Sequence, residues 1–179
     1  MKKVIFLALV FTLTACAVTV KTYQKPDQSF DAYETWCWMN GCEVTYQGPE
    51  YLYDQKVVDE IANAIAFNMY EKGYQQGDDQ SDLMVNFFMV IEEDSAEVSN
   101  FNGFYDGTYQ GEREWLTVLY PEYQKFLKGS LVIDVIDREN SELLWRSNSV
   151  KYLEMNPIYD RDEIWKGVAK AMKKLPGKE

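Results

Sequence analysis

Two apolar segments joined by a short polar turn, close to the C-terminus, constrain the fold of this chain more than any other feature. Residues 128–138 (KGSLVIDVIDR) are rich in β-branched residues, and residues 143–150 (LLWRSNSV) return after the turn at residues 139–141. This pattern predicts a β-hairpin. A third run, residues 83–91 (LMVNFFMVI), is almost continuously apolar and predicts a strand covered on most of both faces.

Apolar residues at three- and four-residue spacing, each set preceded by a capping residue, predict two helices. Asp54 can cap a helix that runs to Lys72. Asp160 and Glu163 form a capping box at the start of the second helix, which is expected to end at Pro176-Gly177. Each helix has one apolar stripe, so each is expected to pack on the sheet.

Shorter alternating segments predict further strands at residues 18–23 and 33–38, and a weaker strand at residues 116–120 that ends at Pro121. Strands and helices follow one another in blocks. We therefore predict an α+β fold, a two-layer sandwich in which two helices pack on one face of an antiparallel or mixed sheet. A chain of 179 residues, 46% of them hydrophobic, is expected to form a single domain with a sizeable core.

The N-terminal residues have the features of a lipoprotein signal. Lys2 and Lys3 precede an apolar stretch, residues 4–13 (VIFLALVFTL). As a helix this stretch spans about 15 Å, roughly half of a bilayer core, which favours a cleaved signal over a membrane-spanning helix. Residues 13–16 (LTAC) resemble the lipobox of bacterial lipoproteins. We therefore expect the thiol of Cys16 to carry a diacylglycerol group.

Lipidation would hold the protein on a membrane, because each buried methylene of an acyl chain contributes about 0.8 kcal/mol. Ala17 follows Cys16, which in lipoproteins of this kind favours the outer membrane over the inner membrane. We expect residues 1–15 to be the cleaved signal peptide and residues 16–179 a single envelope domain, with residues 16–29 as tether and first strand. The alternative is an ordinary secreted signal followed by an incidental cysteine.

The other two cysteines are Cys37 and Cys42, on either side of a turn signal, Asn40-Gly41. The flanking runs favour a hairpin in which the two cysteines face each other. In an oxidising envelope compartment a structural disulfide is the favoured interpretation, and its small loop predicts about 2 kcal/mol of stabilisation. Free thiols and a redox pair are the alternatives, although redox pairs more often have C-x-x-C spacing.

Histidine is absent from the chain, which excludes the Ser-His-Asp and Cys-His nucleophile systems and the common zinc sites. The formal net charge of −11 excludes nucleic-acid binding through phosphate neutralisation. Acidic runs at residues 78–82 and 92–94 lack the spacing of a calcium loop and are interpreted as solvated loops. No metal and no cofactor is expected.

Two aspartates lie in the predicted C-terminal hairpin. Asp134 and Asp137 are three residues apart on a strand, so their side chains point to opposite faces and cannot form a close carboxylate pair. Asp137 is expected to cap the turn. Asp134 is expected to pair with a basic residue of the neighbouring strand, for which Arg146 is a candidate.

Four segments carry a family resemblance through their order and spacing. They are Phe30–Trp36 (FDAYETW), Lys72–Tyr74 with Asp82–Val85 (KGY and DLMV), Gly129–Asp137 (GSLVIDVID) and Leu143–Arg146 (LLWR). Together they resemble the bacterial lipoproteins of domain-of-unknown-function family 4136, over about residues 18–176. The resemblance implies an α+β envelope domain and no established activity. The chain departs from the family pattern at the Cys37–Cys42 insertion and at Ser147, where glycine is usual.

An aromatic-rich segment is the candidate binding surface. Aromatic rings bury a large area at low entropic cost, so they favour contacts with sugars or partner proteins. The alternative is that these rings cover the sheet face left open by the helices. The residues are Phe101, Phe104, Tyr105, Tyr109, Trp115, Tyr120 and Tyr123.

The leading hypothesis from the sequence is a lipid-anchored, non-enzymatic envelope protein with a structural or interaction role. Its expected partners are a membrane, through the lipid, and an envelope protein or glycan. The alternative is a periplasmic binder of a small ligand or glycan, or a weak carboxylate-dependent hydrolase. That alternative requires converging acidic residues in a pocket lined by the aromatic residues.

Overall fold

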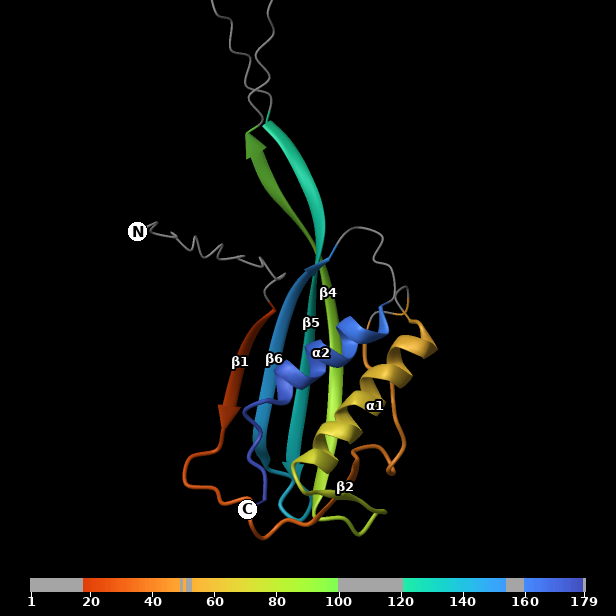
Figure 1. Ribbon diagram of the computed structural model, residues 1–179, viewed down its shortest axis with the longest axis vertical. Coiled ribbons are helices and arrows are strands. Elements are labelled where there is room, and N and C mark those ends of the chain that lie inside the picture. The colour runs from red at the N-terminus through yellow and green to blue at the C-terminus, as the bar shows by residue number, and fades with distance from the viewer. Residues whose placement is uncertain (1–17, 49, 51–52, 100–120, 154–159, 179) are drawn as a thin grey trace, which may run out of the picture.

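A computed structural model describes residues 18–48, 50, 53–99, 121–153 and 160–178 of the chain. In this part of the chain six strands and two helices are formed (Figure 1). In chain order they are β1 (Thr19–Gln24), β2 (Thr35–Trp38), α1 (Gln55–Glu71), β3 (Gln75–Gln76), β4 (Leu83–Ser99), β5 (Pro121–Asp137), β6 (Leu143–Leu153) and α2 (Arg161–Met172).

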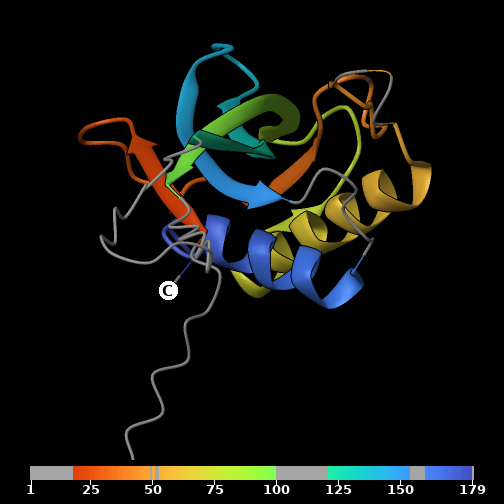
Figure 2. The same ribbon diagram turned by 90° about the horizontal axis from the view of Figure 1, so that it is seen from above.

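The strands form one mixed sheet in the order β1-β6-β5-β4-β2-β3. Strands β1, β6, β5 and β4 pair antiparallel, whereas β2 is parallel to both β4 and β3. Both helices lie on the same side of this sheet, as the view from above shows (Figure 2). The prediction of an α+β sandwich with two helices on one face is confirmed.

Helix α1 has the predicted boundaries because its caps are local. The carboxylate of Asp54 accepts a hydrogen bond from the backbone N–H of Lys56, and Lys72 is the C-terminal capping residue. Gly73 follows at a φ of +91°, a conformation that glycine adopts without strain. An aspartate cap of this kind contributes about 1 kcal/mol to helix stability.

Helix α2 begins at the predicted residue but ends earlier than predicted. Asp160 accepts hydrogen bonds from the backbone N–H groups of Asp162 and Glu163. The last helical residue is Met172, so the helix stops before Pro176-Gly177. A turn follows, and it places Leu175 in the core with almost no exposed surface.

The hydrophobic core lies between the helices and the sheet face that they cover. The large, fully buried side chains of that face include Trp36 of β2, Trp145 of β6 and Phe87 of β4, with Ile133 of β5 between them in the sheet. Edge-to-face ring contacts link Phe87 to Trp38, and Trp38 to Trp36. These large rings bury much apolar area, which is the main stabilising contribution in a domain of this size.

Strand β4 extends beyond the predicted residues 83–91, and β5 begins earlier than the predicted residue 128. Residues 94–99 pair with residues 121–126 beyond the end of β6, whose last residue Leu153 pairs with Leu127. At about 3.3 Å per residue, this two-stranded ribbon projects about 20 Å from the sheet. Figure 1 shows it above the end of the sheet at which β1 begins.

Pro121 is the first residue of β5. A proline is tolerated at this position because no ladder hydrogen bond from its nitrogen is needed at the start of a strand. The strand predicted at residues 116–120 lies outside the described residues.

The predicted cysteine hairpin is wrong as a strand pair. After β2, only an isolated bridge between Asn40 and Glu43 forms across the turn. Strand β2 is already paired with β4 on one edge and β3 on the other, so it has no free edge for a returning strand. The chain instead returns beside β4, where the N–H of Met89 donates a hydrogen bond to the carbonyl of Gln47 at 2.8 Å.

Candidate interaction surface

The sheet face opposite the helices is not covered by any described helix, and we call it the open face. Side chains alternate along a strand, so residues that flank those of the core point to this face. The strand register places them in matched rows across the sheet. The open face consists of Tyr23, Met84, Asn86, Phe88, Val90, Val132, Asp134, Ile136, Arg146 and Tyr152.

A polar row crosses the middle of the open face. The register aligns Asn86 of β4, Asp134 of β5, Arg146 of β6 and Tyr23 of β1. The guanidinium of Arg146 binds the carboxylate of Asp134 through two hydrogen bonds of 2.6 Å, from Nε to Oδ1 and from Nη2 to Oδ2. This arrangement confirms the pairing proposed for Asp134 from the sequence.

The ion pair is asymmetric in its exposure to solvent. Asp134 is only 3% exposed, whereas nearly half of the Arg146 side chain is exposed. The hydrogen bonds to Asp134 raise the pKa of Arg146 above its usual value. The open face therefore carries a permanent positive group at its centre, over a carboxylate that is shielded from water.

Apolar and aromatic side chains surround this polar row. Tyr23 is 48% exposed, Val90 is 43% exposed and Tyr152 is 58% exposed. Phe88 and Val132, which are paired across β4 and β5, are half-buried. A wide sheet face that combines exposed apolar groups with a few polar groups is suited to contact with another protein surface.

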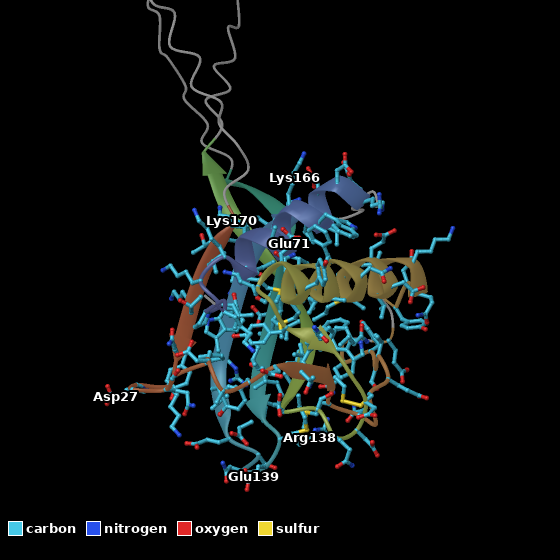
Figure 3. All side chains as sticks on the ribbon, turned by 60° about the horizontal axis from the view of Figure 1, so that its bottom comes forward. Asp27, Glu71, Arg138, Glu139, Lys166 and Lys170 are labelled. Carbon is cyan, nitrogen blue, oxygen red and sulfur yellow. A yellow bond between two sulfur atoms is a disulfide. The ribbon has the colours of Figure 1, made fainter. Side chains whose placement is uncertain are left out.

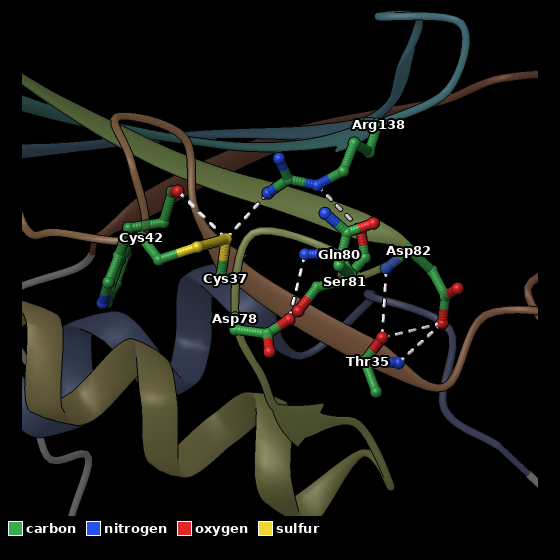
Figure 4. The surroundings of a disulfide bond; sticks show 9 residues. Thr35, Cys37, Cys42, Asp78, Gln80, Ser81, Asp82 and Arg138 are labelled. Atoms are coloured by element: carbon green, nitrogen blue, oxygen red, sulfur yellow. Dashed lines mark hydrogen bonds between the residues drawn. A yellow bond between two sulfur atoms is a disulfide. The ribbon is translucent and has the colours of Figure 1, made fainter.

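The disulfide predicted from the sequence is present between Cys37 and Cys42, with a distance of 4.9 Å between their Cα atoms. Cys37 lies in β2 and is fully buried, whereas Cys42 lies in the following turn at a φ of +63° and is partly exposed. The Nη2 atom of Arg138 donates a hydrogen bond of 2.7 Å to Sγ of Cys37 (Figure 4).

Beside the disulfide, Asp82 fixes the start of β2 to the start of β4. Its Oδ2 atom accepts a hydrogen bond of 2.8 Å from the backbone N–H of Glu34. It also accepts bonds of 2.8 Å from the backbone N–H of Thr35 and of 3.0 Å from the Thr35 hydroxyl (Figure 4). The hydrogen bond from Glu34, followed by those from Thr35, lowers the pKa of Asp82 below its usual value.

Asp137 has a similar role at the turn between β5 and β6. Burial alone would raise its pKa, but hydrogen bonds from the backbone N–H of Asn140 and the hydroxyl of Tyr33 outweigh burial, and the pKa is lowered. Burial and the bond to Asp137 together raise the pKa of Tyr33 to about 12. Asp137 is therefore a turn-capping carboxylate, as predicted, and it lies on the opposite face from Asp134.

Most of the other site residues predicted from the sequence lie outside the described residues. These include Cys16 and all the aromatic candidates of residues 101–120. The backbone of Tyr123 belongs to β5 and pairs with Glu97, but its side chain is not described. The remaining predicted residues of the aromatic segment are Phe101, Phe104, Tyr105, Tyr109, Trp115 and Tyr120.

Among the described residues, no three potential metal ligands come together in a way that could hold a metal ion. Neither α1 nor α2 combines the length and the apolar character needed to cross a bilayer, and no other helix is described.

A family model for a domain of unknown function, DUF4136, matches residues 20–177. The chain belongs to the DUF4136 family. The match covers both helices and all of the described sheet except Thr19, the first residue of β1, so the resemblance to family 4136 inferred from four short segments is confirmed. No curated protein matches the chain.

Solved structures of low sequence identity share the fold of this DUF4136 protein. A PDZ domain protein from Parabacteroides distasonis has a TM-score of 0.58 at 15% identity over 91% of this chain. The match spans only 36% of that longer protein. The PelC dodecamer from Paraburkholderia phytofirmans has a TM-score of 0.51 at 10% identity, over 91% of this chain and 100% of PelC.

A DUF4136 family protein from Bacteroides thetaiotaomicron is also similar, with 16% identity over 88% of this chain and 95% of that chain, and a TM-score of 0.45. At these identities the similarity concerns the fold alone. The PDZ domain protein and PelC place the sheet and the two helices of this chain in a recurring architecture, and neither assigns an activity to it.

The sequence reasoning missed two parts of the site. The open face was not identified, because residues 83–91 are apolar on both faces and gave no sign of which face the helices would leave bare. Arg138 was not linked to the cysteines, because the two lie 101 residues apart in the chain. Only the position of Arg138 at the end of a predicted strand could have suggested that it lies at an end of the sheet.

Proposed function

We propose that this protein is a lipid-anchored envelope protein, held through Cys16 on the outer membrane, and that its domain is a non-enzymatic module that assembles with further copies of itself. The observation that carries the anchor is the LTAC segment at residues 13–16, directly after an apolar stretch. Strand β1 begins at Thr19, so the sheet starts only three residues after the lipidated cysteine. At about 3.4 Å per extended residue, that end of the sheet lies within about 10 Å of the anchor.

The structure near β1 supports a fixed orientation on the membrane. The ammonium group of Lys170 in α2 donates a hydrogen bond of 2.6 Å to the carbonyl of Val18, so the residue before β1 is held against the helix layer. Figure 3 places Lys170 at the opposite end of the molecule from Arg138 and Glu139. The β4–β5 ribbon therefore projects from the end that the anchor holds near the membrane.

The proposal that copies of this chain assemble rests on the open face and on the fold. Tyr23, Val90 and Tyr152 expose apolar surface on a sheet face that no described helix covers. PelC, which has the same fold, is a dodecamer. A protein held in a membrane by lipid diffuses in two dimensions, which raises the effective concentration of neighbouring copies and favours such assembly.

The anchor is tested by the mass of the protein extracted from cell membranes. We expect a mass increment of diacylglycerol size together with loss of residues 1–15. Cys16→Ala should lose both the increment and the membrane association. A parent chain without this mass increment would contradict the proposed lipidation.

The assembly is tested by analytical ultracentrifugation of the detergent-extracted protein. Tyr23→Ser, on the open face, should shift the protein towards monomer. Tyr70→Ser is the matched control, because Tyr70 is a 70% exposed tyrosine on α1, on the other side of the molecule. A monomeric parent chain, or equal effects of the two variants, would contradict the proposed self-assembly. Neither outcome would bear on the proposed lipid anchor.

A further inference from the structure

The two cysteines of the Cys37–Cys42 disulfide differ in their exposure to solvent. Cys37 is a residue of β2 with no exposed surface, and it lies between neighbouring strands. Cys42 lies in a turn and is partly exposed. Thiol–disulfide exchange requires a thiolate to approach one sulfur along the S–S bond, so the attack is directed at Cys42.

The sulfur on the buried side has a positively charged neighbour. Nη2 of Arg138 lies 2.7 Å from Sγ of Cys37. The same side chain is held by a 2.7 Å hydrogen bond from Nε to the carbonyl of Ser81, and its backbone N–H donates to the carbonyl of Asp82 at 3.0 Å. Among the described residues, no carboxylate forms an ion pair with Arg138. The guanidinium is thus free to stabilise negative charge on the Cys37 sulfur.

We propose that the Cys37–Cys42 disulfide is a thiol–disulfide exchange site for a dithiol protein, with Cys42 as the attacked sulfur and Cys37 as the leaving thiolate bound by Arg138. Exchange is faster when the leaving thiolate is stabilised, so the position of Arg138 favours cleavage in this direction. The buried cysteine keeps its place in β2, and the cysteine in the turn carries the covalent bond to the partner.

The reaction is a two-electron exchange. A thiolate of the dithiol partner attacks Sγ of Cys42, a new S–S bond forms, and the electron pair of the Cys37–Cys42 bond leaves on Sγ of Cys37. The second thiol of the partner then loses its proton to water. The resulting thiolate attacks the partner's first sulfur, which is bonded to Cys42 in the mixed disulfide. Cys42 leaves as a thiolate and takes a proton from water. The partner is oxidised to a disulfide, and this protein is reduced to a Cys37 thiolate and a Cys42 thiol.

Apolar groups beside Cys42 favour a protein over a small thiol as the partner. Met39 and Val44 lie three residues before and two residues after Cys42, and both are exposed. Exposed apolar side chains on either side of an attacked sulfur supply the contact area that a protein partner needs during the mixed-disulfide step.

The test uses the full chain with Cys16→Ala, so that the result does not depend on the proposed anchor. Oxidised protein is treated with glutathione to capture the mixed disulfide, and peptide mass spectrometry locates it. Reduction by dithiothreitol is timed separately by quenching with a maleimide. We expect glutathione on Cys42. We also expect Arg138→Gln to slow reduction about tenfold through loss of the stabilised leaving group, and Arg138→Lys to restore most of the rate.

Arg161→Gln is the matched control, because Arg161 lies on α2 in an exposed ion pair with Glu60. The disulfide of this variant should be reduced at the same rate as that of the parent. Glutathione on Cys37, or a rate for Arg138→Gln within twofold of the parent, would overturn the proposal. Circular dichroism first establishes that each variant is folded, since Arg138 also binds Ser81. If Arg138→Gln does not fold, the site of glutathione addition in the parent chain still decides the proposal.

Discussion

The two faces of the sheet are built from the same strands, yet they are stabilised in different ways. On the covered face, Trp145, Ile133 and Phe87 are excluded from water by the two helices. On the open face, the central contact is the ion pair between Asp134 and Arg146, and the side chains around it remain partly exposed. Apolar burial therefore stabilises the fold on one side, and the other side retains surface that can contact a partner.

The largest expected effect is on the covered face. Trp145→Ala removes a fully buried indole from between the sheet and the helices, and should lower the free energy of unfolding by about 3–5 kcal/mol. Chemical denaturation followed by circular dichroism measures this change. Tyr152→Ala, on the open face of the same strand, is the control. Equal losses for the two variants would contradict the difference between the faces.

The ion pair of the open face should contribute less. Asp134→Ala leaves a partly exposed guanidinium without its carboxylate, and we expect a loss of about 1–2 kcal/mol, because water can solvate the exposed half of Arg146. The double variant Asp134→Leu with Arg146→Met should recover most of the stability of the parent. Chemical denaturation of both variants tests this, and a double variant no more stable than Asp134→Ala would contradict it.

A smaller effect is expected from the carboxylates at the end of the sheet that carries the β5–β6 turn. The pKa values of Asp82 and Asp137 are lowered in the folded state, so the unfolded chain binds more protons in acid. Their contribution is complete above the ordinary aspartate pKa of about 3.9 and is lost as the pH falls below it.

Asp82→Asn keeps an acceptor oxygen near the N–H groups of Glu34 and Thr35 but removes the charge. It should lower stability at neutral pH by about 1 kcal/mol and flatten the decline in acid. Thermal unfolding measured from pH 2 to pH 7 tests both effects. A variant whose acid decline is as steep as that of the parent would contradict this account of Asp82.

The smallest effect on stability should come from the exposed apolar groups of the open face. Val90→Thr keeps a β-branched side chain in β4 and should change the free energy of unfolding by less than about 0.5 kcal/mol. The same variant should weaken self-association if the open face is the contact surface. Thermal unfolding and analytical ultracentrifugation measure the two properties separately. A large loss of stability with unchanged association would show that Val90 serves folding rather than contact.

The starts of both helices and the end of α1 were predictable almost to the residue because their signals are local. The carboxylates of Asp54 and Asp160 bind N–H groups two or three residues further along the chain. Gly73 ends α1 through its own backbone conformation. The sequence does not determine the register of the hairpin formed by β5 and β6, although the positions of Asp134 and Arg146 on neighbouring strands make them candidates for a pair.

The cysteine segment was predictable only in part. The short spacing of Cys37 and Cys42 was enough to expect a disulfide, because residues so close in sequence can meet without the rest of the fold. The expected pairing of β2 with the segment just after the cysteines does not form. Strand β2 pairs instead with β4 and β3, which lie more than 35 positions away in the chain. The extent of the β4–β5 ribbon was missed for a similar reason, because a polar strand such as residues 92–99 is stabilised by its cross-strand partner.

The sequence by itself determined the helices, the main apolar strands, the absence of histidine chemistry and the α+β class, because caps, composition and periodicity act over a few residues. Only the tertiary structure decided which sheet face the helices cover and which neighbours each strand takes. It also decided that Arg138 lies against the buried sulfur of Cys37. These features depend on contacts between residues distant in the chain, and such contacts form only when the whole sheet has assembled around its core.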